Sequence, residues 1–497
     1  MQQKFIKNLL LLLVLNLLIK PFWLLGIDRS VQNTVGASDY GFYFALLNFS
    51  FLFHILLDLG ITNFNNRNIS QNHHLLGKHL PNIFVIKLLL FGVYLAFTIG
   101  GAFVIDYSPE QLLLLLVLAF NQFLMSMILY FRSNLTGLQL FKTDGLISIL
   151  DRSLMIVLVG VLLWGNVVAE FKIRHFVFAQ TVSYLITFLV TFNLVYKKSG
   201  VSSLKFSWNP PFMIAIIRQS LPFALLVLLM TLYTRIDGVM LERMLEDGAR
   251  FSGIYASAFR IFDAAVQFSF LFAVLLLPIF SRMLKLNQKV DELIGLSFIL
   301  VITPAIILAI GSFFYSSEIM TLLYPAYSGE TIAQFGVRVQ ESGRALALLM
   351  LCLIGASASY IFGTVLTANG SLRTLNVIAL GGLVVNFGLN LVLIPNLKVE
   401  GAAYASLATH SVVALVQALV VVKVFRLKIS KGYLFRSLLL VLGVVMMGFL
   451  SRLLPLPWFI SIVLMAFGSL LVAIFIRFFP IMQFFKIFFS KEVDTTH

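Results

Sequence analysis

Charged residues are scarce in this chain. Asp, Glu, Lys and Arg make up 11% of its 497 residues, whereas a soluble globular protein carries about 25%. A single cysteine, Cys352, excludes an intrachain disulfide and a cysteine-based metal site. The sequence also lacks a G-x-x-x-x-G-K-S/T phosphate-binding loop: Gly77-Lys78-His79 has the Gly-Lys pair, but neither the hydroxyl residue nor the preceding glycine. No H-E-x-x-H motif is present either. We therefore expect no enzyme activity, no cofactor and no metal.

No stretch between the apolar runs is long enough to be a folded soluble domain. A bilayer core about 30 Å thick needs roughly 20 apolar residues per helix, and long runs without in–out alternation favour helices over barrel strands. The first run is too long for a signal peptide, so we expect it to remain as a span. The sequence predicts an all-α membrane protein with 14 transmembrane helices, at residues 5–27, 39–60, 82–105, 110–131, 145–165, 174–196, 219–241, 253–281, 292–314, 343–367, 375–394, 401–423, 434–451 and 456–478.

The basic residues are spread unevenly over the loops between these runs. The net charge is +15. With the N-terminus inside, 22 Lys and Arg residues fall on the inner side and 9 on the outer side, which is the positive-inside pattern. We therefore expect a multi-pass protein with both termini in the cytoplasm. Because the charge is distributed over many short loops, we expect no nucleic-acid partner.

The chain divides into two lobes at a loop that cannot be helical. This loop contains Trp208-Asn209-Pro210-Pro211 and lies between the sixth and seventh runs. A Gly-x-Tyr echo supports the division, because it begins the second helix of each lobe, at Gly41 and at Gly253. We expect residues 1–205 to form an N-lobe of helices 1–6 and residues 206–428 a C-lobe of helices 7–12. The two pseudo-symmetric six-helix lobes would surround a central cavity, and residues 429–497 would form helices 13–14 and a short cytoplasmic tail.

Two local signals concern helix starts and helix packing. Ser108-Pro109-Glu110 places a cap, a first-turn proline and an acid at the start of helix 4. Gly355, Ser359 and Gly363 recur at every fourth residue of helix 10. Such a face lets helices approach closely in lipid.

Ionisable residues inside the apolar runs are the candidates for function. A charge in the bilayer interior costs about 2.5–3.5 kcal/mol or more unless it is paired or hydrated. Counting along each helix places one group in the outer half of the membrane and another near the inner ends. The outer group is Lys20, Arg235, Asp237, Arg260 and Asp263, and the inner group is Asp58, Lys87, and Asp151 with Arg152.

Several of these residues have simpler interpretations. The inner group is close enough to the interface for its side chains to reach water. Arg260 and Asp263 are three residues apart on one helix face and could neutralise each other. Arg235 and Asp237 are two apart, so they point to different faces and need partners elsewhere. Lys20 precedes Pro21, and a cation at a helix kink would suit an anionic ligand.

Short motifs on these helices resemble those of bacterial polysaccharide flippases, in the multidrug/oligosaccharidyl-lipid/polysaccharide exporter superfamily. They are TRIDGVML at residues 234–241, GIYASAFRI at 253–261, LPIF at 277–280, GAAYAS at 401–406 and LDLG at 57–60. The resemblance implies two six-helix lobes, often with two further C-terminal helices. It also implies alternating access that turns a polyprenyl-pyrophosphate-linked oligosaccharide from the inner to the outer leaflet of the bacterial inner membrane.

The resemblance also suggests roles for the buried charges. Cationic residues of the cavity would meet the pyrophosphate or sugar: Arg235 and Arg260 match the motifs, whereas Lys20 and Lys87 rest on burial alone. Acidic residues would couple transport to an ion gradient or act as a gate, at Asp237, Asp263, Asp58 and Asp151. The expected partners are a lipid-linked oligosaccharide, membrane lipids and a polysaccharide polymerase complex.

Two other functions remain open from the sequence. A related exporter could carry drug cations or the peptidoglycan lipid precursor. A drug exporter would be expected to have a cavity dominated by acids. The ionisable residues predicted above to lie inside the membrane are instead five cations and four acids. A membrane polymerase or ligase would be expected to carry a large outer loop with catalytic arginines or histidines, and the longest outer loop here is about 28 residues.

Overall fold

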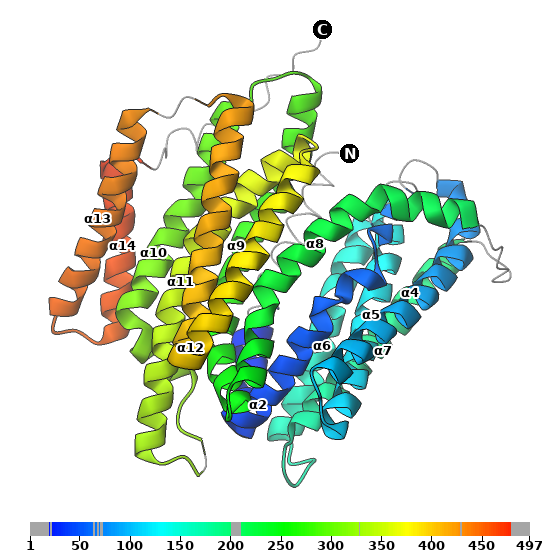
Figure 1. The fold of residues 1–497 in the computed structure, drawn as a ribbon, viewed down its shortest axis with the longest axis horizontal. Coiled ribbons are helices and arrows are strands. Elements are labelled where there is room, and N and C mark those ends of the chain that lie inside the picture. Colours follow the sequence, from blue (N-terminus) through cyan, green and yellow to red (C-terminus); the bar gives the residue numbers. More distant parts are fainter. Residues whose placement is uncertain are drawn as a thin grey trace. The chain divides into compact units, whose positions relative to one another are not determined.

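The computed structural model consists of helices and short connections (Figure 1). It describes residues 19, 22–62, 65, 66, 69, 73–199, 210–327, 329–427 and 430–478; the side chains of 78, 210–217, 219, 220 and 278 lie outside this description. Over these ranges there is no β-strand. The helices are η1 (Trp23–Asp28), α2 (Arg29–Leu52), η2 (His54–Leu57), η3 (His73–Leu75), α4 (Leu76–Val104), α5 (Pro109–Gly137), α6 (Phe141–Trp164), α7 (Ile173–Ser199), α8 (Pro210–Met244), α9 (Gly248–Lys285), α10 (Asp291–Leu323), α11 (Ile332–Ala368), α12 (Leu372–Phe425), α13 (Lys431–Leu453) and α14 (Trp458–Phe475).

The all-helical class is confirmed, and eleven helices in the described part are long and apolar enough to cross a membrane. The predicted number of fourteen is not confirmed. Two predicted spans, 375–394 and 401–423, form one element, α12, whose two helices join at Lys398 (φ 50°, ψ −123°), with Pro395 just before the joint. The predicted first run, 5–27, lies mostly outside the described residues.

The described residues group by their contacts into two compact units, which we describe separately. Unit 1 holds those of Met1–Arg260, Leu323–Phe335 and Phe387–Ala402. Unit 2 holds those of Ile261–Leu322, Gly336–Asn386 and Ala403–His497. The two predicted lobes and their boundaries at 205/206 and 428/429 stay a prediction.

In unit 1, helix α5 is the central element. It packs on α7, α2 and α4, and 61% of its most apolar window is buried inside the protein. Its start matches the local signal, because Ser108 Oγ accepts from the Gln111 amide and the Ser108 amide donates to Gln111 Oε1. Phe131 on α5 packs its ring against Phe188 and Phe192 of α7. Interlocked aromatic rings therefore hold this pair of helices together.

The second predicted helix, 39–60, differs from α2 at both ends. Helical backbone begins earlier, through the π-helix η1, and continues past a kink at Gly36 (φ 84°). It then stops at Leu52, a 3₁₀ turn follows, and Leu59 and Gly60 both have positive φ. A single helix over 39–60 is therefore wrong, because the backbone turns out of the helix before Asp58.

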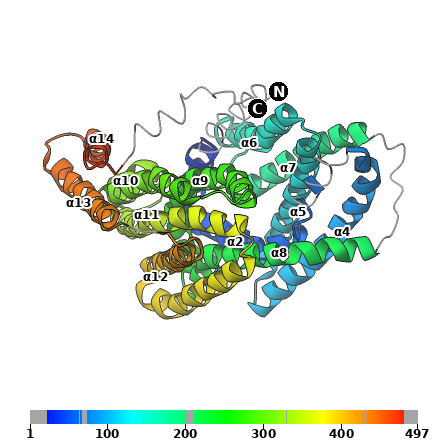
Figure 2. The ribbon, with the colours of Figure 1, turned by 90° about the horizontal axis from the view of Figure 1, so that it is seen from above.

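Unit 2 is built around α11, which is also 61% buried in its most apolar window. The predicted small face brings α11 close to α12, since a Cβ on Gly355 would lie 2.8 Å from the carbonyl oxygen of His410. Helices α13 and α14 pack side by side (Figures 1 and 2). Their contact with α10 includes a 2.8 Å hydrogen bond from Tyr315 to Ser451.

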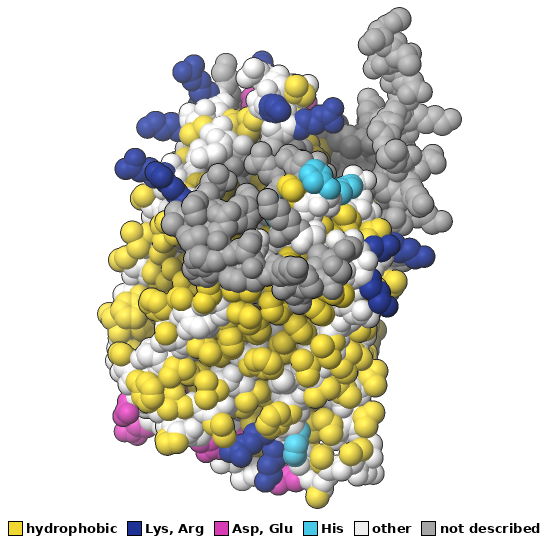
Figure 3. Space-filling model, turned by 90° about the vertical axis from the view of Figure 1, so that its right-hand side faces the viewer, with side chains coloured by type: hydrophobic (Ala, Val, Ile, Leu, Met, Phe, Trp, Pro, Cys, Tyr) yellow, Lys and Arg dark blue, Asp and Glu magenta, His cyan; other side chains and the backbone are white. Residues whose placement is uncertain are grey.

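The surface matches a protein that lies in lipid. One face carries a continuous band of hydrophobic side chains (Figure 3). Exposed large apolar residues such as Leu113, Val157 and Leu189 lie on the membrane-length helices of unit 1.

Candidate functional site

The predicted site residues of unit 1 fall into separate polar centres. Arg235 and Asp237 lie on α8, Arg260 on α9, Lys87 on α4, and Asp58 just after η2. Asp151 lies on α6 in unit 1, and Asp263 lies partly buried on α9 in unit 2. Lys20 lies outside the described residues.

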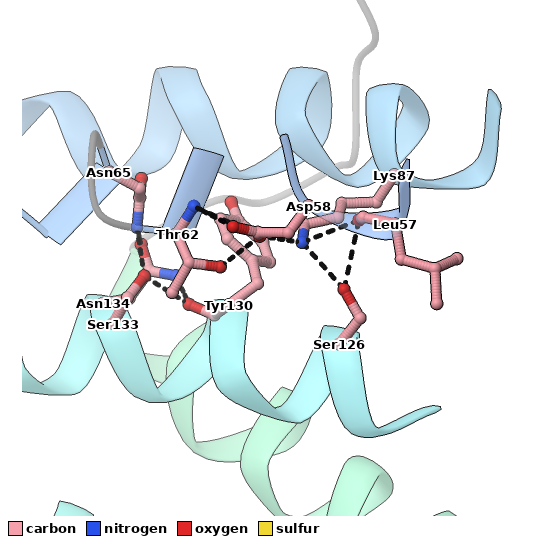
Figure 4. Close-up of polar contacts among 9 residues, drawn as sticks. All are labelled: Leu57, Asp58, Thr62, Asn65, Lys87, Ser126, Tyr130, Ser133 and Asn134. Carbon is pink, nitrogen blue, oxygen red and sulfur yellow. Dashed lines mark hydrogen bonds and ion pairs between the residues drawn. The ribbon is translucent and has the colours of Figure 1, made fainter. Parts of the chain in front are cut away.

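The first centre joins Lys87 to the end of η2 (Figure 4). Lys87 is only 1% exposed. Its ammonium forms an ion pair with Asp58 and donates to the Leu57 carbonyl oxygen at 3.0 Å and to Ser126 Oγ at 2.9 Å. Thr62 also donates to the Asp58 carboxylate. The interpretation that Lys87 reaches the interface is wrong, because its three N–H groups are used inside the protein.

Lys87 thus stabilises the place where the second helix breaks. A helix end leaves carbonyl oxygens without partners, and a cation favours that end. The ammonium supplies both a donor and a charge at Leu57. A few residues further along the chain, Asn65 donates to Ser133 and Asn134 of α5, both at 2.9 Å (Figure 4). The segment after η2 is therefore tied to α4 and to α5.

The second centre surrounds Asp237, which is 1% exposed. Its Oδ2 accepts from the Tyr255 hydroxyl at 2.8 Å, and its Oδ1 accepts from Asn390 Nδ2 at 2.7 Å. Three helices, α8, α9 and α12, therefore meet at one buried carboxylate. The prediction that Asp237 needs partners on other helices is confirmed.

The third centre holds Arg235 between aromatic rings. Its guanidinium lies 5.5 Å from the Phe51 ring centroid and 5.2 Å from that of Phe259. An aromatic face attracts a cation by about 0.5–1 kcal/mol, and by more when the pair is desolvated. The two rings hold the guanidinium in place.

The fourth centre pairs Arg260 with an acid that the sequence interpretation missed. Arg260 Nε lies 3.0 Å from Asp28 Oδ2 and donates to the Tyr40 hydroxyl at 3.1 Å. Tyr40 in turn donates to the same carboxylate oxygen at 2.6 Å. The Phe44 ring lies under the guanidinium at 5.4 Å. Asp28 follows the first predicted run, which ends at residue 27, so the sequence did not mark it as a buried residue. The helical backbone continues through Asp28 and leaves it 3% exposed.

An aromatic wall connects this centre to Arg152. Tyr40 packs on Tyr43, Tyr43 on Phe176, and Phe176 stacks on Trp23. The Arg152 guanidinium lies 5.7 Å from the Trp23 ring centroid and donates to the Tyr184 hydroxyl at 3.2 Å. Its contact with the adjacent Asp151 is longer, at 3.7 Å.

Arg152 lies halfway along α6, which begins at Phe141 and has 24 residues. Its predicted place near the inner end of the membrane stays a prediction. Three arginines of unit 1, at positions 152, 235 and 260, pack on aromatic rings away from the ends of their helices. Arg243 and Arg250 also lie over rings, but close to the end of α8 and the start of α9.

The chemistry of these guanidinium groups suits the binding of an anion. Guanidinium groups match phosphate oxygens through paired N–H donors. Among the residues that the structure describes, no group of three or more His, Cys, Asp or Glu side chains is placed to hold a metal ion.

Comparison with solved structures identifies the fold. The chain is similar to a structure described as lipid II flippase MurJ in an inward closed conformation, with a TM-score of 0.70 at 14% identity over 93% of this chain and 98% of that one. It is also similar to an inward-facing multidrug resistance MATE family transporter of the MOP superfamily (TM-score 0.59, 16% identity, 81% of this chain and 94% of that one). The Vibrio cholerae MATE transporter VcmN, in its bent form, gives a TM-score of 0.56 at 13% identity over 86% of this chain and 97% of that one.

Comparison of the sequence gives the family. No curated protein matches the chain in sequence. The family model described as "Polysaccharide biosynthesis protein" matches residues 5–284, more than half of the chain. That range includes the motif at residues 234–241, the Gly-x-Tyr echo and the three aromatic-packed arginines. The chain therefore belongs to the polysaccharide biosynthesis protein family and has the fold of the MurJ and MATE transporters.

Proposed function

We propose that this protein is a flippase that moves a polyprenyl-pyrophosphate-linked oligosaccharide from the inner to the outer leaflet of the bacterial inner membrane. The observation that supports this proposal most is a set of three arginines in unit 1, at positions 152, 235 and 260. They pack on aromatic rings away from the ends of their helices. A charge in the bilayer interior is costly unless it is paired or hydrated, so such residues mark candidate substrate sites. A pyrophosphate is an anion whose oxygens match guanidinium donors.

The pairing of Arg260 with Asp28 gives a simple binding step. In this structure the Asp28 carboxylate lies against the guanidinium, at 3.0 Å. A pyrophosphate oxygen would take its place, so Asp28 acts as an internal counter-ion while no cargo is bound. Arg235 would supply the second guanidinium, since its rings hold its plane while its N–H edge meets the anion.

The rest of the proposed mechanism combines the sequence predictions with the fold and the family. Fourteen helices in two six-helix lobes and a C-terminal pair would alternate between inward-open and outward-open states, with both termini in the cytoplasm. Binding and lobe motion need no covalent step. The oligosaccharide would then pass to a polysaccharide polymerase complex for O-antigen, capsule or exopolysaccharide synthesis.

A second cargo is favoured by one specific comparison. The MurJ structure has the highest TM-score of the three compared above and is described as a lipid II flippase. Lipid II, the peptidoglycan lipid precursor, shares the polyprenyl pyrophosphate and differs in the sugar. The arginine centres serve either lipid equally, so the two cargoes are distinguished by which surface polymer stops when the protein is absent.

The direct test is Arg235→Ala in a strain whose own copy of the gene is deleted. Export of surface polysaccharide should be lost while the amount of inserted protein stays unchanged, because the anion loses a guanidinium in a low-dielectric site. Arg174→Ala is the matched control, since Arg174 is exposed and paired with Glu110. Normal surface glycan in the Arg235 variant would contradict the role, and loss of peptidoglycan synthesis in the deletion strain would support the second cargo.

A further inference from the structure

The two copies of the Gly-x-Tyr echo touch each other. A Cβ on Gly41 of α2 would lie 1.8 Å from the carbonyl oxygen of Ala249, and a Cβ on Gly253 of α9 would lie 1.8 Å from that of Ala37. Each glycine thus contacts the residue four positions before the other glycine. Two Ala-x-x-x-Gly segments cross reciprocally, as expected if a two-fold axis relates the repeats. We refer to this contact as the Gly41–Gly253 crossing.

Polar contacts surround the crossing on the same side of unit 1. Gln32 Nε2 donates to the Gly253 carbonyl oxygen at 2.9 Å. Gln111 Nε2, at the start of α5, donates to Glu242 Oε1 at 2.8 Å, at the end of α8. Arg243 donates to the carbonyl oxygens of Ile105 and Asp106 in the turn before α5. Each of these bonds joins the segment before residue 140 to the segment after residue 240.

The chemistry of these contacts allows repeated separation. At the crossing, backbones meet without side chains between them, so parting them exposes little apolar surface. The surrounding donors and acceptors can exchange partners with water. Helices α2 and α9 share one ring pair, Phe44 with Phe259 at 5.9 Å. In the α5–α7 contact the rings of Phe131, Phe188 and Phe192 interlock and resist separation.

Helices α2 and α9 both start on the side of the membrane that the distribution of loop charges predicts to be the outer face. We propose that the Gly41–Gly253 crossing is the outer gate of the transport cycle, closed in this structure, and that it parts when cargo leaves for the outer leaflet. This inference rests on the proposed function for its role in export. The separation itself can be measured without transport.

The first experiment adds a methyl group at the crossing to push the two helices apart. Gly41→Ala inserts a methyl group where the backbone of α9 already lies, and overpacking of that kind shifts an equilibrium by roughly tenfold or more. The readout is the yield of cross-linking between Gln111→Cys and Glu242→Cys by a short bifunctional methanethiosulfonate, in a Cys352→Ser background. Gly92→Ala is the control, because a Cβ there meets nothing within 4 Å. We expect the yield to fall in the Gly41 variant alone, and an equal yield in both would overturn the inference.

The second experiment locks the gate with Gly41 intact. The cross-link between positions 111 and 242 should stop export until a reductant removes it. The control lock is a disulfide between Ser269→Cys and Ser357→Cys, whose hydroxyl oxygens lie 2.8 Å apart between α9 and α11 in unit 2; export should continue with it. Export that continues through a complete 111–242 cross-link would overturn the gate and leave the flippase proposal standing. If the wild-type chain itself fails to restore surface polysaccharide in the deletion strain, the proposed function is wrong. The cross-linking yield of the Gly41→Ala variant then still tests whether the crossing opens.

Discussion

Replacement of Lys87 by methionine tests whether this residue stabilises the fold or binds cargo. The side chain is 1% exposed, and its ammonium bonds to Asp58, the Leu57 carbonyl oxygen and Ser126. Methionine keeps the side chain's length up to the Cε atom and removes the charge and all three donors. Asp58 would keep only its bonds from Thr62.

The expected loss of stability follows from the burial of both partners. Removing one member of a buried ion pair costs about 3–5 kcal/mol, because the other charge stays buried and unpaired. The Asp58 side chain is 20% exposed, so water can hydrate it in part. We therefore expect the lower end, about 3 kcal/mol. Asp58→Asn should cost a similar amount, since it leaves the ammonium without a counter-charge.

The assay is a double-mutant cycle on the free energy of unfolding in detergent micelles. The double variant Lys87→Met/Asp58→Asn carries no charge at either position, and its asparagine can still accept from the Thr62 amide. It should lose less stability than the sum of the single variants, by about 2–3 kcal/mol of coupling. Arg174→Met, in an exposed pair with Glu110, should change stability by about 0–1 kcal/mol.

Two results would refute this reasoning. One is a Lys87→Met protein as stable as the wild type, and the other is a double variant that shows no coupling. Measuring export of surface polysaccharide then distinguishes a role of Lys87 in stability from a role in cargo binding. A double variant that regains stability and exports normally supports a structural role, whereas regained stability without export supports the cargo contact predicted from the sequence.

Two further predictions concern the other buried acids. Asp237→Asn should reduce transport more than cargo binding if this carboxylate couples to an ion, because the amide keeps the side chain's size and loses the charge. Unchanged transport in response to an imposed or collapsed gradient would remove that role. Asp28→Asn should strengthen the binding of farnesyl pyrophosphate, used as a short probe, by roughly fivefold or more, because Arg260 loses its competing counter-ion; equal affinity measured by titration calorimetry would argue against an internal counter-ion.

The helices themselves could be predicted because hydrocarbon imposes one rule on every residue. A backbone amide in lipid must be bonded within its own segment, so a long apolar run predicts a helix without knowledge of its neighbours. The runs at 434–451 and 456–478 correspond to α13 and α14. The cap at Ser108 was equally readable, because its partners lie three residues away. The prediction failed after Leu52, where the α-helix changes to a 3₁₀ turn whose last carbonyl accepts from Lys87 of α4.

The candidate site could be predicted only in part, because its contacts join segments that are distant in the sequence. The motif at residues 234–241 marked Arg235 and Asp237, and their spacing of two required partners on other helices. No local pattern could name Tyr255 and Asn390 as those partners of Asp237. Asp28 was invisible as a site residue, because its burial depends on a helix that continues beyond the apolar run.

Composition and run length thus determined, from the sequence alone, that this protein lies in a membrane as a set of helices. Tertiary structure decided which charges pair, which arginines pack on aromatic rings, and that the two Gly-x-Tyr segments meet at a crossing. The physical reason is the range of the interactions. Solvation by lipid acts on each segment separately, whereas an ion pair or a backbone contact exists only once distant segments have been brought together.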